Sequence, residues 1–104
     1  MVKNNNDVPT DDTILGVSSH LEVMGNPTRL KIMYYLATKE IGVLELSEHL
    51  EMSMPAISHH LRVLKDKKIV RRRQEGKNVF YIMDDPCLIQ VLELTRLHIE
   101  EHHS

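Results

Sequence analysis

The spacing of apolar residues along the chain predicts five helices and one β-hairpin. Apolar positions three and four residues apart indicate helices over residues 13–24, 27–38, 43–50, 53–65 and 85–102. Three of these begin with helix-initiating chemistry, at Asn26, Ser53 and Asp85, each followed within two residues by a proline. Residues 69–73 and 79–83 have the β-branched and aromatic content of strands, and the segment 74–78 supplies a turn with Gly76. The predicted fold is mainly α with a small hairpin (α+β), in the order α-α-α-α-β-β-α.

The segment 53–65 has two distinct faces. Ile57, Leu61 and Leu64 form an apolar stripe that should face a core, and His60 beside it should also be packed. The opposite face carries small, hydrogen-bonding and cationic residues: Ser53, Pro55, Ser58, His59 and Arg62. Such a face suits a DNA major groove, although an ordinary amphipathic surface helix is the commoner case. The short helix 43–50 and a three-residue linker precede it, and this arrangement is typical of a helix-turn-helix.

The hairpin after this helix is interpreted as a wing, which makes the predicted architecture a winged helix-turn-helix. Its cations Arg71, Arg72, Arg73 and Lys77 could contact phosphates or enter a minor groove. The net charge of −2 conceals an asymmetry, because residues 62–77 hold eight Lys and Arg against two acidic residues. A basic surface on an acidic body suits phosphate binding. The alternative is a charged hairpin edge that only discourages aggregation.

Length and composition limit the remaining possibilities. The 104 residues suffice for one domain, expected over residues 13–104 after a polar, flexible arm over residues 1–12. Cys87 is the single cysteine, which excludes an internal disulfide framework. No apolar run approaches a membrane span and the N-terminus does not look like a secretion signal, so we expect a cytoplasmic protein. The chain has no Gly-rich phosphate loop and no recognisable nucleophile–base pair, so an enzyme is not expected.

The last predicted helix carries more apolar residues than one small domain needs. They cover much of its circumference: Leu88, Ile89, Val91, Leu92, Leu94, Leu97 and Ile99. We interpret it as a helix that forms a dimer, packing together with the helix 13–24.

Three motifs, in this order, resemble the ArsR/SmtB family of bacterial winged-helix repressors. They are the segments Met24–Ile32, Ile57–Leu64 and Gln74–Tyr81, within a similarity that spans roughly residues 14–102. The resemblance implies a homodimer that represses an operon until an inducer, often a metal ion, weakens its binding to operator DNA.

Candidate metal ligands lie at both ends of the last helix. Asp85 and Cys87 open it, and His98 and Glu101 lie near its end, with His102 as an alternative ligand and His103 behind it. Cys87 and His98 share a face, but they lie about 16 Å apart along the axis, too far to share one ion. Two antiparallel copies would bring the first pair of one subunit beside the second pair of the other.

The family resemblance implies a specific set of ligands for this metal site. One class of site in the family pairs Asp-x-His at the start of this helix with His-x-x-His or His-x-x-Glu at its end. Asp85, His98 and Glu101 match this pattern, and Cys87 stands where a histidine is usual. Four such ligands suit Zn(II), while a thiolate makes a softer ion more competitive, so Cd(II), Ni(II) and Cu(I) are alternatives.

Two other functions stay open at this point. The first is a repressor of the same fold that senses a redox or other non-metal signal through Cys87. The second is a winged-helix protein-interaction module that binds its partner through the acidic body. His20 and His49 have no partner that the sequence identifies, so we expect both to be structural or exposed.

Overall fold

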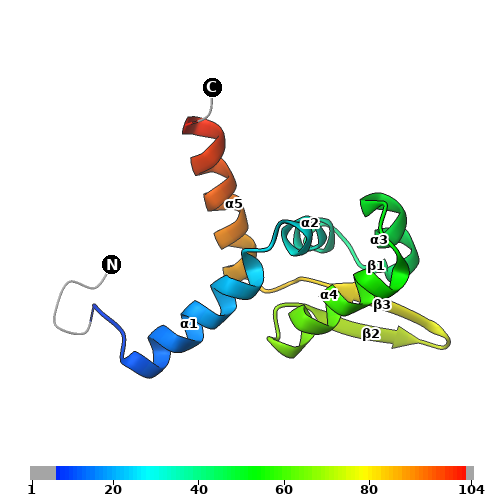
Figure 1. Cartoon of the computed structure of the whole chain (residues 1–104), viewed down its shortest axis with the longest axis horizontal. Coiled ribbons are helices and arrows are strands. Elements are labelled where there is room, and N and C mark those ends of the chain that lie inside the picture. The colour runs from blue at the N-terminus through cyan, green and yellow to red at the C-terminus, as the bar shows by residue number, and fades with distance from the viewer. Residues whose placement is uncertain (1–6, 103–104) are drawn as a thin grey trace.

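The computed structural model describes residues 7–102, so most of the predicted arm (residues 1–6) and His103 lie outside the described residues. Within that range the chain forms five helices and three strands (Figure 1). The helices are α1 (Asp11–Met24), α2 (Pro27–Leu36), α3 (Val43–Leu50), α4 (Met54–Asp66) and α5 (Pro86–His102). The strands are β1 (Ile41–Gly42), β2 (Arg71–Glu75) and β3 (Asn78–Ile82). The predicted helix order and the hairpin are confirmed.

Side-chain caps explain where the helices begin. The Asn26 side chain accepts a hydrogen bond from the Arg29 N–H at 3.0 Å, and the Ser53 hydroxyl accepts one from the Ala56 N–H at 3.3 Å. Each cap satisfies a backbone donor that has no partner inside its helix. The first helix begins two residues earlier than predicted because Thr10 caps it in the same way.

The sheet contains one strand that the sequence pattern did not predict. Its strand order is β1-β3-β2 with antiparallel neighbours, and Ile41 of β1 lies opposite Tyr81 of β3. The pattern of apolar residues predicts no element between residues 38 and 43. A two-residue strand is too short to show a periodic pattern, and it forms only because the folded hairpin presents β3 as a pairing edge.

The hairpin begins two residues later than predicted. Ile69 and Val70 are buried in the core and do not pair in β2. Their β-branched side chains fill the core, so they were not a signal for a strand. Lys68, at a φ of 59°, redirects the chain between α4 and this buried pair. The turn is also tighter than expected, because Glu75 pairs with Asn78 across a two-residue loop whose first residue, Gly76, has a φ of +62°.

The core lies beneath the helix-turn-helix. Ile57, Leu61 and Leu64 are fully buried, as the apolar stripe of α4 predicted. They pack in one cluster with buried residues of α2, α3, β1 and the segments flanking the hairpin: Ile32, Met33, Leu36, Ile41, Leu46, Ile69, Val70 and Met83. This core holds α4 with its other face turned outward.

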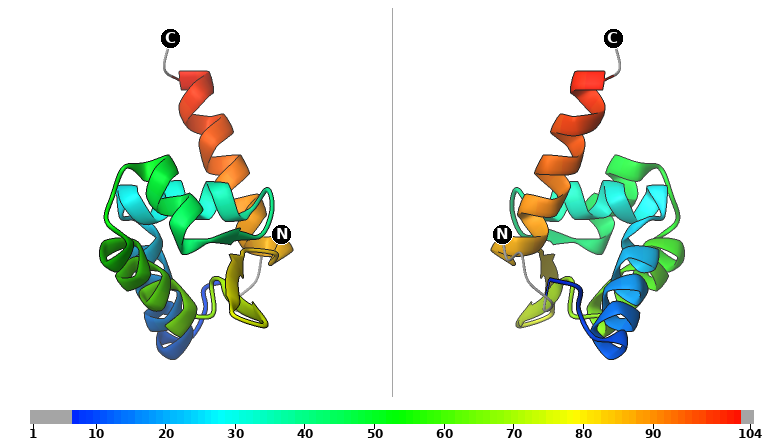
Figure 2. Two further views of the ribbon diagram at one scale, coloured as in Figure 1. Left: turned by 90° about the vertical axis from the view of Figure 1, so that its right-hand side faces the viewer. Right: turned by 90° about the vertical axis from the view of Figure 1, so that its left-hand side faces the viewer.

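Helices α1 and α5 extend away from this core. Figures 1 and 2 show that the C-terminal half of α5 stands clear of the other elements. Over the described residues each of the two helices has only one buried residue, Met24 in α1 and Leu92 in α5. Both leave large apolar side chains exposed: Ile14, Leu15, Val17, Leu21, Val91, Leu94, Leu97 and Ile99. Between residues 7 and 102 no helix is long and apolar enough to cross a membrane.

Candidate nucleic-acid interface and metal centre

Helix α4 presents the residues predicted to read DNA on its outer side. Ser53, Pro55, His59 and Arg62 are exposed and Ser58 is half-buried, opposite the buried Ile57 stripe. The turn that sets α4 against α3 is fixed by the backbone: Glu51 takes a left-handed conformation, and the Met52 N–H donates to the Ser47 carbonyl at 3.1 Å. The arrangement leaves a row of short polar groups and one guanidinium open to a ligand.

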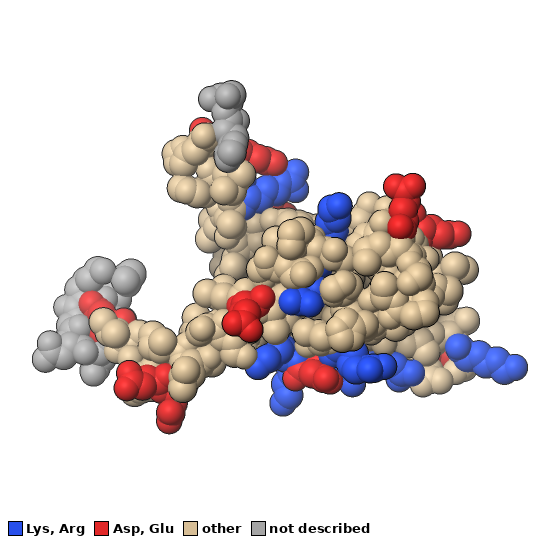
Figure 3. All heavy atoms as spheres, viewed as in Figure 1, with Lys and Arg blue, Asp and Glu red and all other residues tan. Residues whose placement is uncertain are grey.

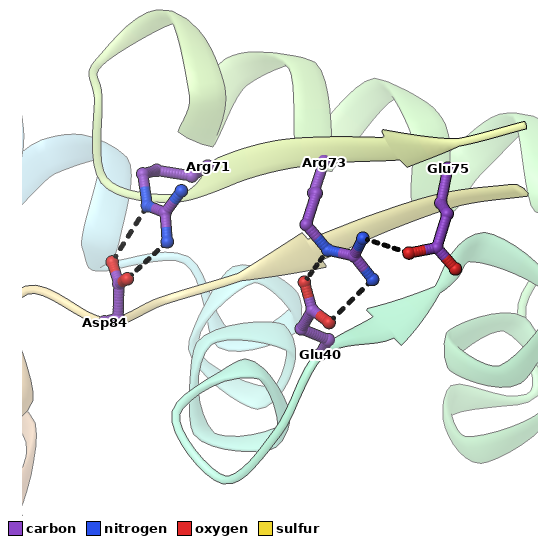
Figure 4. Close-up of polar contacts among 5 residues, drawn as sticks. All are labelled: Glu40, Arg71, Arg73, Glu75 and Asp84. Atoms are coloured by element: carbon purple, nitrogen blue, oxygen red, sulfur yellow. Dashed lines mark hydrogen bonds and ion pairs between the residues drawn. The ribbon is translucent and has the colours of Figure 1, made fainter.

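Two of the predicted wing contacts are engaged within the chain (Figure 4). Arg71 donates from Nε and Nη2 to the two carboxylate oxygens of Asp84, at 3.1 and 2.5 Å. Arg73 donates to both oxygens of Glu40, at 2.5 and 2.9 Å, and to Glu75 at 3.0 Å. Sequence reasoning missed Glu40 and Asp84. They flank β1 and β3, and only the sheet topology brings them to β2.

These ion pairs also change the ionisation of their members. The hydrogen bond from Arg73 lowers the pKa of the Glu40 carboxyl, and the hydrogen bond from Arg71 lowers the pKa of Asp84. The same contacts raise the pKa of both guanidinium groups. All four groups therefore stay charged near neutral pH, and the positive charge of the segment 62–77 is partly neutralised by acids from outside it.

Five of the other six cations of this segment remain open, whereas Lys67 is half-buried and donates a hydrogen bond to the Ser19 hydroxyl. Arg62, Lys65, Lys68, Arg72 and Lys77 are exposed and make no ion pair with any described residue. Lys65, Lys68 and Arg72 line one shallow depression together with Val70 and Arg71. Figure 3 shows Lys and Arg side chains along the edge of the molecule formed by α4 and the hairpin. This edge is the basic surface, formed by the five open cations.

His60 is packed, as predicted, and lies near the end of α1. Arg29 donates from Nε to the Val23 carbonyl at 2.6 Å, and its Nη1 lies 3.4 Å from His60 Nδ1. Burial, and then the charge of Arg29, lower the pKa of His60. This histidine therefore lies where α4 packs against α1 and α2.

His20 and His49 also have partners that sequence reasoning did not identify. His49 stacks on Tyr35 with ring centroids 4.6 Å apart and contacts Glu45 at 3.2 Å. His20 makes a local hydrogen bond with the Gly16 carbonyl at 3.1 Å. Both contacts lie within the chain, which agrees with the prediction that these histidines are structural or exposed.

The candidate metal ligands occupy the two ends of α5. Asp85 caps the helix, with Oδ1 accepting from the N–H groups of Cys87 and Leu88 at 2.9 and 3.2 Å. The Cys87 thiol is exposed, and at the other end the His98 and His102 rings lie edge to face with centroids 4.5 Å apart. Within the described part of a single chain, no three potential ligands come together at one point. This agrees with the distance of about 16 Å between the helix ends.

The candidate ligands share a face of α5 with exposed apolar residues. Cys87, Val91, Leu94, His98 and Glu101 follow one another at steps of four, three, four and three residues, which places them in one stripe along the helix. All five are exposed in the single chain, whereas Leu88 and Leu92 pack toward the core. An apolar centre with potential metal ligands at each end is therefore exposed along α5.

Comparison with known proteins identifies the family. The family model "Bacterial regulatory protein, arsR family" matches residues 26–72. The chain is 36% identical to the cadmium resistance transcriptional regulatory protein CadC homolog of Staphylococcus aureus, over 84% of this chain and 73% of that protein. It is 29% identical to the transcriptional repressor SmtB homolog of Synechocystis, over 82% of this chain and 64% of that protein.

Solved structures agree with this assignment. The AntR antimony-specific transcriptional repressor matches with a TM-score of 0.82 at 32% identity, covering 94% of this chain and 89% of that chain. HlyU from Vibrio cholerae matches with a TM-score of 0.78 at 33% identity, covering 86% and 99%. The chain therefore belongs to the arsR family of bacterial regulatory proteins and is a regulator rather than an enzyme.

Proposed function

We propose that this protein is a homodimeric transcriptional repressor that leaves its operator DNA when a metal ion binds between the α5 helices of the two subunits. The observation that carries the proposal is the exposed stripe of α5, in which Cys87 lies at one end, His98 and Glu101 lie at the other, and Val91 and Leu94 lie between them.

The apolar faces of α1 and α5 support the dimer. A groove of about 470 Å³ lies between the two helices, lined by residues that include Val17, Leu21, Leu88 and Val91. Exposed apolar surface of this extent on a small domain marks an interaction site. A twofold axis through the centre of the α5 stripe would bury this surface against the same surface of a second copy.

The outward face of α4 and the basic surface support DNA binding. In the proposed complex α4 lies in the major groove, where Ser58, His59 and Arg62 face the base edges. The cations of the basic surface contact phosphates on either side. Two copies related by a twofold axis would then bind two half-sites, and the spacing of the two α4 helices would have to match the repeat of the duplex.

The donor set of α5 fits a thiophilic divalent ion such as Zn(II). Asp85 uses Oδ1 for its cap, and Oδ2 accepts no hydrogen bond from the described residues. Asp85 and Cys87 would hold the ion together with the partner subunit's His98 and Glu101. One thiolate, one imidazole and two carboxylates make four ligands of the types that bind zinc tetrahedrally. Relatives named for cadmium resistance and for antimony specificity support a soft ion as well.

The metal would act by linkage between two sites. An ion that binds more tightly to one arrangement of the two subunits favours that arrangement, and by reciprocity DNA weakens metal binding as much as metal weakens DNA binding. Only residues 83–85 separate β3 from the N-terminal end of α5, and Leu92 packs into the core. A shift of α5 would therefore be passed to the wing and to α4.

The test combines metal binding and DNA binding in one set of variants. Metal-free protein is titrated with Zn(II) and Cd(II), with thiolate-to-metal absorption as one readout. Fluorescence anisotropy of a duplex selected from a random library by the metal-free protein is the other. We expect the metal to weaken DNA binding of the wild type, and Cys87→Ala/His98→Ala to bind DNA normally but to lose this response.

A neighbouring pair of glutamates supplies the matched control. Glu101 lies in the α5 stripe, whereas Glu100 pairs with Arg96 at 3.0 Å on another face of the helix. Glu101→Gln should weaken zinc binding and Glu100→Gln should not. The proposal fails if the double variant binds zinc as tightly as the wild type and still releases DNA in its presence.

The exposed thiol of Cys87 favours a redox signal as the second candidate. Peroxide could oxidise two thiols to one intersubunit disulfide, with release of two waters. In the antiparallel α5 pairing the two Cys87 residues lie at opposite ends, roughly 16 Å apart, which is too far for a disulfide. A disulfide-linked dimer on non-reducing electrophoresis after peroxide treatment would therefore contradict the proposed pairing and favour this candidate.

A further inference from the structure

We infer that the wing divides its cations into two sets. Arg71 and Arg73 fasten the hairpin to the body through Asp84 and Glu40, which are positioning residues. Arg72 and Lys77 are the cations that contact phosphate. This inference rests on the proposed DNA binding, because it assigns roles within that interface.

The two fastening pairs lie on one side of β2. Side chains alternate along a strand, so Arg71 and Arg73 share a face and Arg72 points to the other. In Figure 4 both guanidinium groups point from β2 toward Asp84 and Glu40. The two pairs therefore attach β2 at two successive positions of the same face.

The Arg73 contact spans the whole sheet. Arg73 lies opposite Phe80 of β3, and Phe80 lies opposite Gly42 of β1. The guanidinium carbon of Arg73 sits 5.1 Å from the centre of the Phe80 ring, and its nitrogens reach Glu40, one residue before β1. One side chain thus connects all three strands and fixes the hairpin relative to the start of α3.

Recruiting Arg73 to a phosphate would gain little. Arg73 would exchange two carboxylate oxygens of Glu40 and one of Glu75 for phosphate oxygens of similar geometry. It would also leave both carboxylates unpaired next to the DNA, where like charges repel. The same holds for Arg71, which is joined to Asp84 by two hydrogen bonds.

Arg72 differs from Arg71 and Arg73 because it makes no ion pair with the described residues. It is exposed and lines a depression with Lys65 and Lys68 at the end of α4. Arg71 lines the same depression, but its guanidinium group is held by both carboxylate oxygens of Asp84. Its charge therefore adds to the surface that continues from the proposed reading helix. Lys77 extends this set at the tip of the turn, also exposed and without an ion pair between residues 7 and 102. Both are free to follow a phosphate backbone.

The salt dependence of DNA binding separates the two sets. Each phosphate contact contributes about 0.9 to the slope of log K against log salt, so one residue present in both subunits contributes about 1.8. We expect Arg72→Gln to reduce the slope by about this amount. Arg73→Gln should leave the slope unchanged, although it removes the same charge from a neighbouring position. An equal loss of slope in both variants would overturn the inference.

Glu40 supplies a test in the opposite direction. Glu40→Gln makes the protein more positive, so attraction alone predicts tighter binding with a steeper slope. If Glu40 instead positions Arg73, its loss predicts weaker DNA binding with an unchanged salt slope. It also predicts faster hydrogen exchange of the amides that join β1 to β3. Glu75→Gln is the control, because it changes the charge equally but removes only a single hydrogen bond of Arg73. Tighter and steeper binding of Glu40→Gln would overturn the positioning role.

Two further measurements keep the outcome clear. Arg73→Lys keeps the charge but cannot make two parallel hydrogen bonds to Glu40. If Arg73 fastens the hairpin, this variant should resemble Arg73→Gln in amide hydrogen exchange and in DNA affinity. Wild-type-like behaviour of Arg73→Lys would instead indicate a simple charge contact with DNA. If the wild type itself shows no salt-dependent binding to the selected duplex, the proposed function fails. If the wild type binds DNA but Arg72→Gln and Arg73→Gln reduce the salt slope equally, the proposed function stands. Only the assignment of the wing cations to two sets is then wrong.

Discussion

Truncation of Leu94 tests whether the exposed face of α5 is a subunit interface. Leu94 is 63% exposed in the single chain, in the centre of the α5 stripe. Burying a whole leucine side chain contributes about 1.5–3 kcal/mol, so burying the exposed part contributes about 1–2 kcal/mol. In a twofold dimer both copies of Leu94 lie in the interface, so the contribution is doubled. Because alanine retains the Cβ, we expect Leu94→Ala to cost the dimer about 2–3 kcal/mol.

This cost corresponds to a roughly 30-fold to 150-fold rise in the dimer dissociation constant. Sedimentation equilibrium over a dilution series measures it, in the absence of metal and DNA because either ligand would shift the association. The matched control is Leu44→Ala. Leu44 is 58% exposed on α3, away from the exposed faces of α1 and α5, and its truncation should leave dimerisation unchanged. Equal dissociation constants for the two variants would refute the reasoning.

Three further outcomes follow from the fold. Leu61→Ala, at a fully buried position, should lower the free energy of unfolding by about 2–5 kcal/mol in urea denaturation, and a cost near that of a surface change would contradict the core. Asn26→Ala removes the α2 cap and should cost about 1 kcal/mol in the same assay, whereas Asn26→Asp should retain most of the stability. Burial lowers the pKa of His60 below its ordinary 6.5. The stability that this shift contributes is complete above pH of about 6.5 and is lost as the pH falls through that value toward the lowered pKa. Denaturation between about pH 7.5 and pH 5 should show this loss, which His60→Gln should reduce and the exposed His59→Gln should largely retain.

Local patterns determined most of the secondary structure. The caps at Asn26 and Ser53 act over three residues, and the stripe of Ile57, Leu61 and Leu64 follows from helical geometry alone. Such features are contained in short stretches of sequence, so they could be predicted without knowledge of the rest of the fold. The position of the candidate ligands at the two ends of α5 follows in the same way from helix rise and rotation.

Contacts between distant segments were decided only by the tertiary structure. The charges of residues 62–77 predicted a basic surface that included Arg71 and Arg73. Glu40, however, lies 33 positions before Arg73 and Asp84 lies 13 positions after Arg71, and both reach the wing through the sheet. Strand β1 exists only because β3 offers it an edge. The pairing of Arg29 with His60 likewise depends on how α2 packs on α4. Sequence periodicity records which face of an element is buried, whereas the partner of each charge depends on which elements the fold brings together.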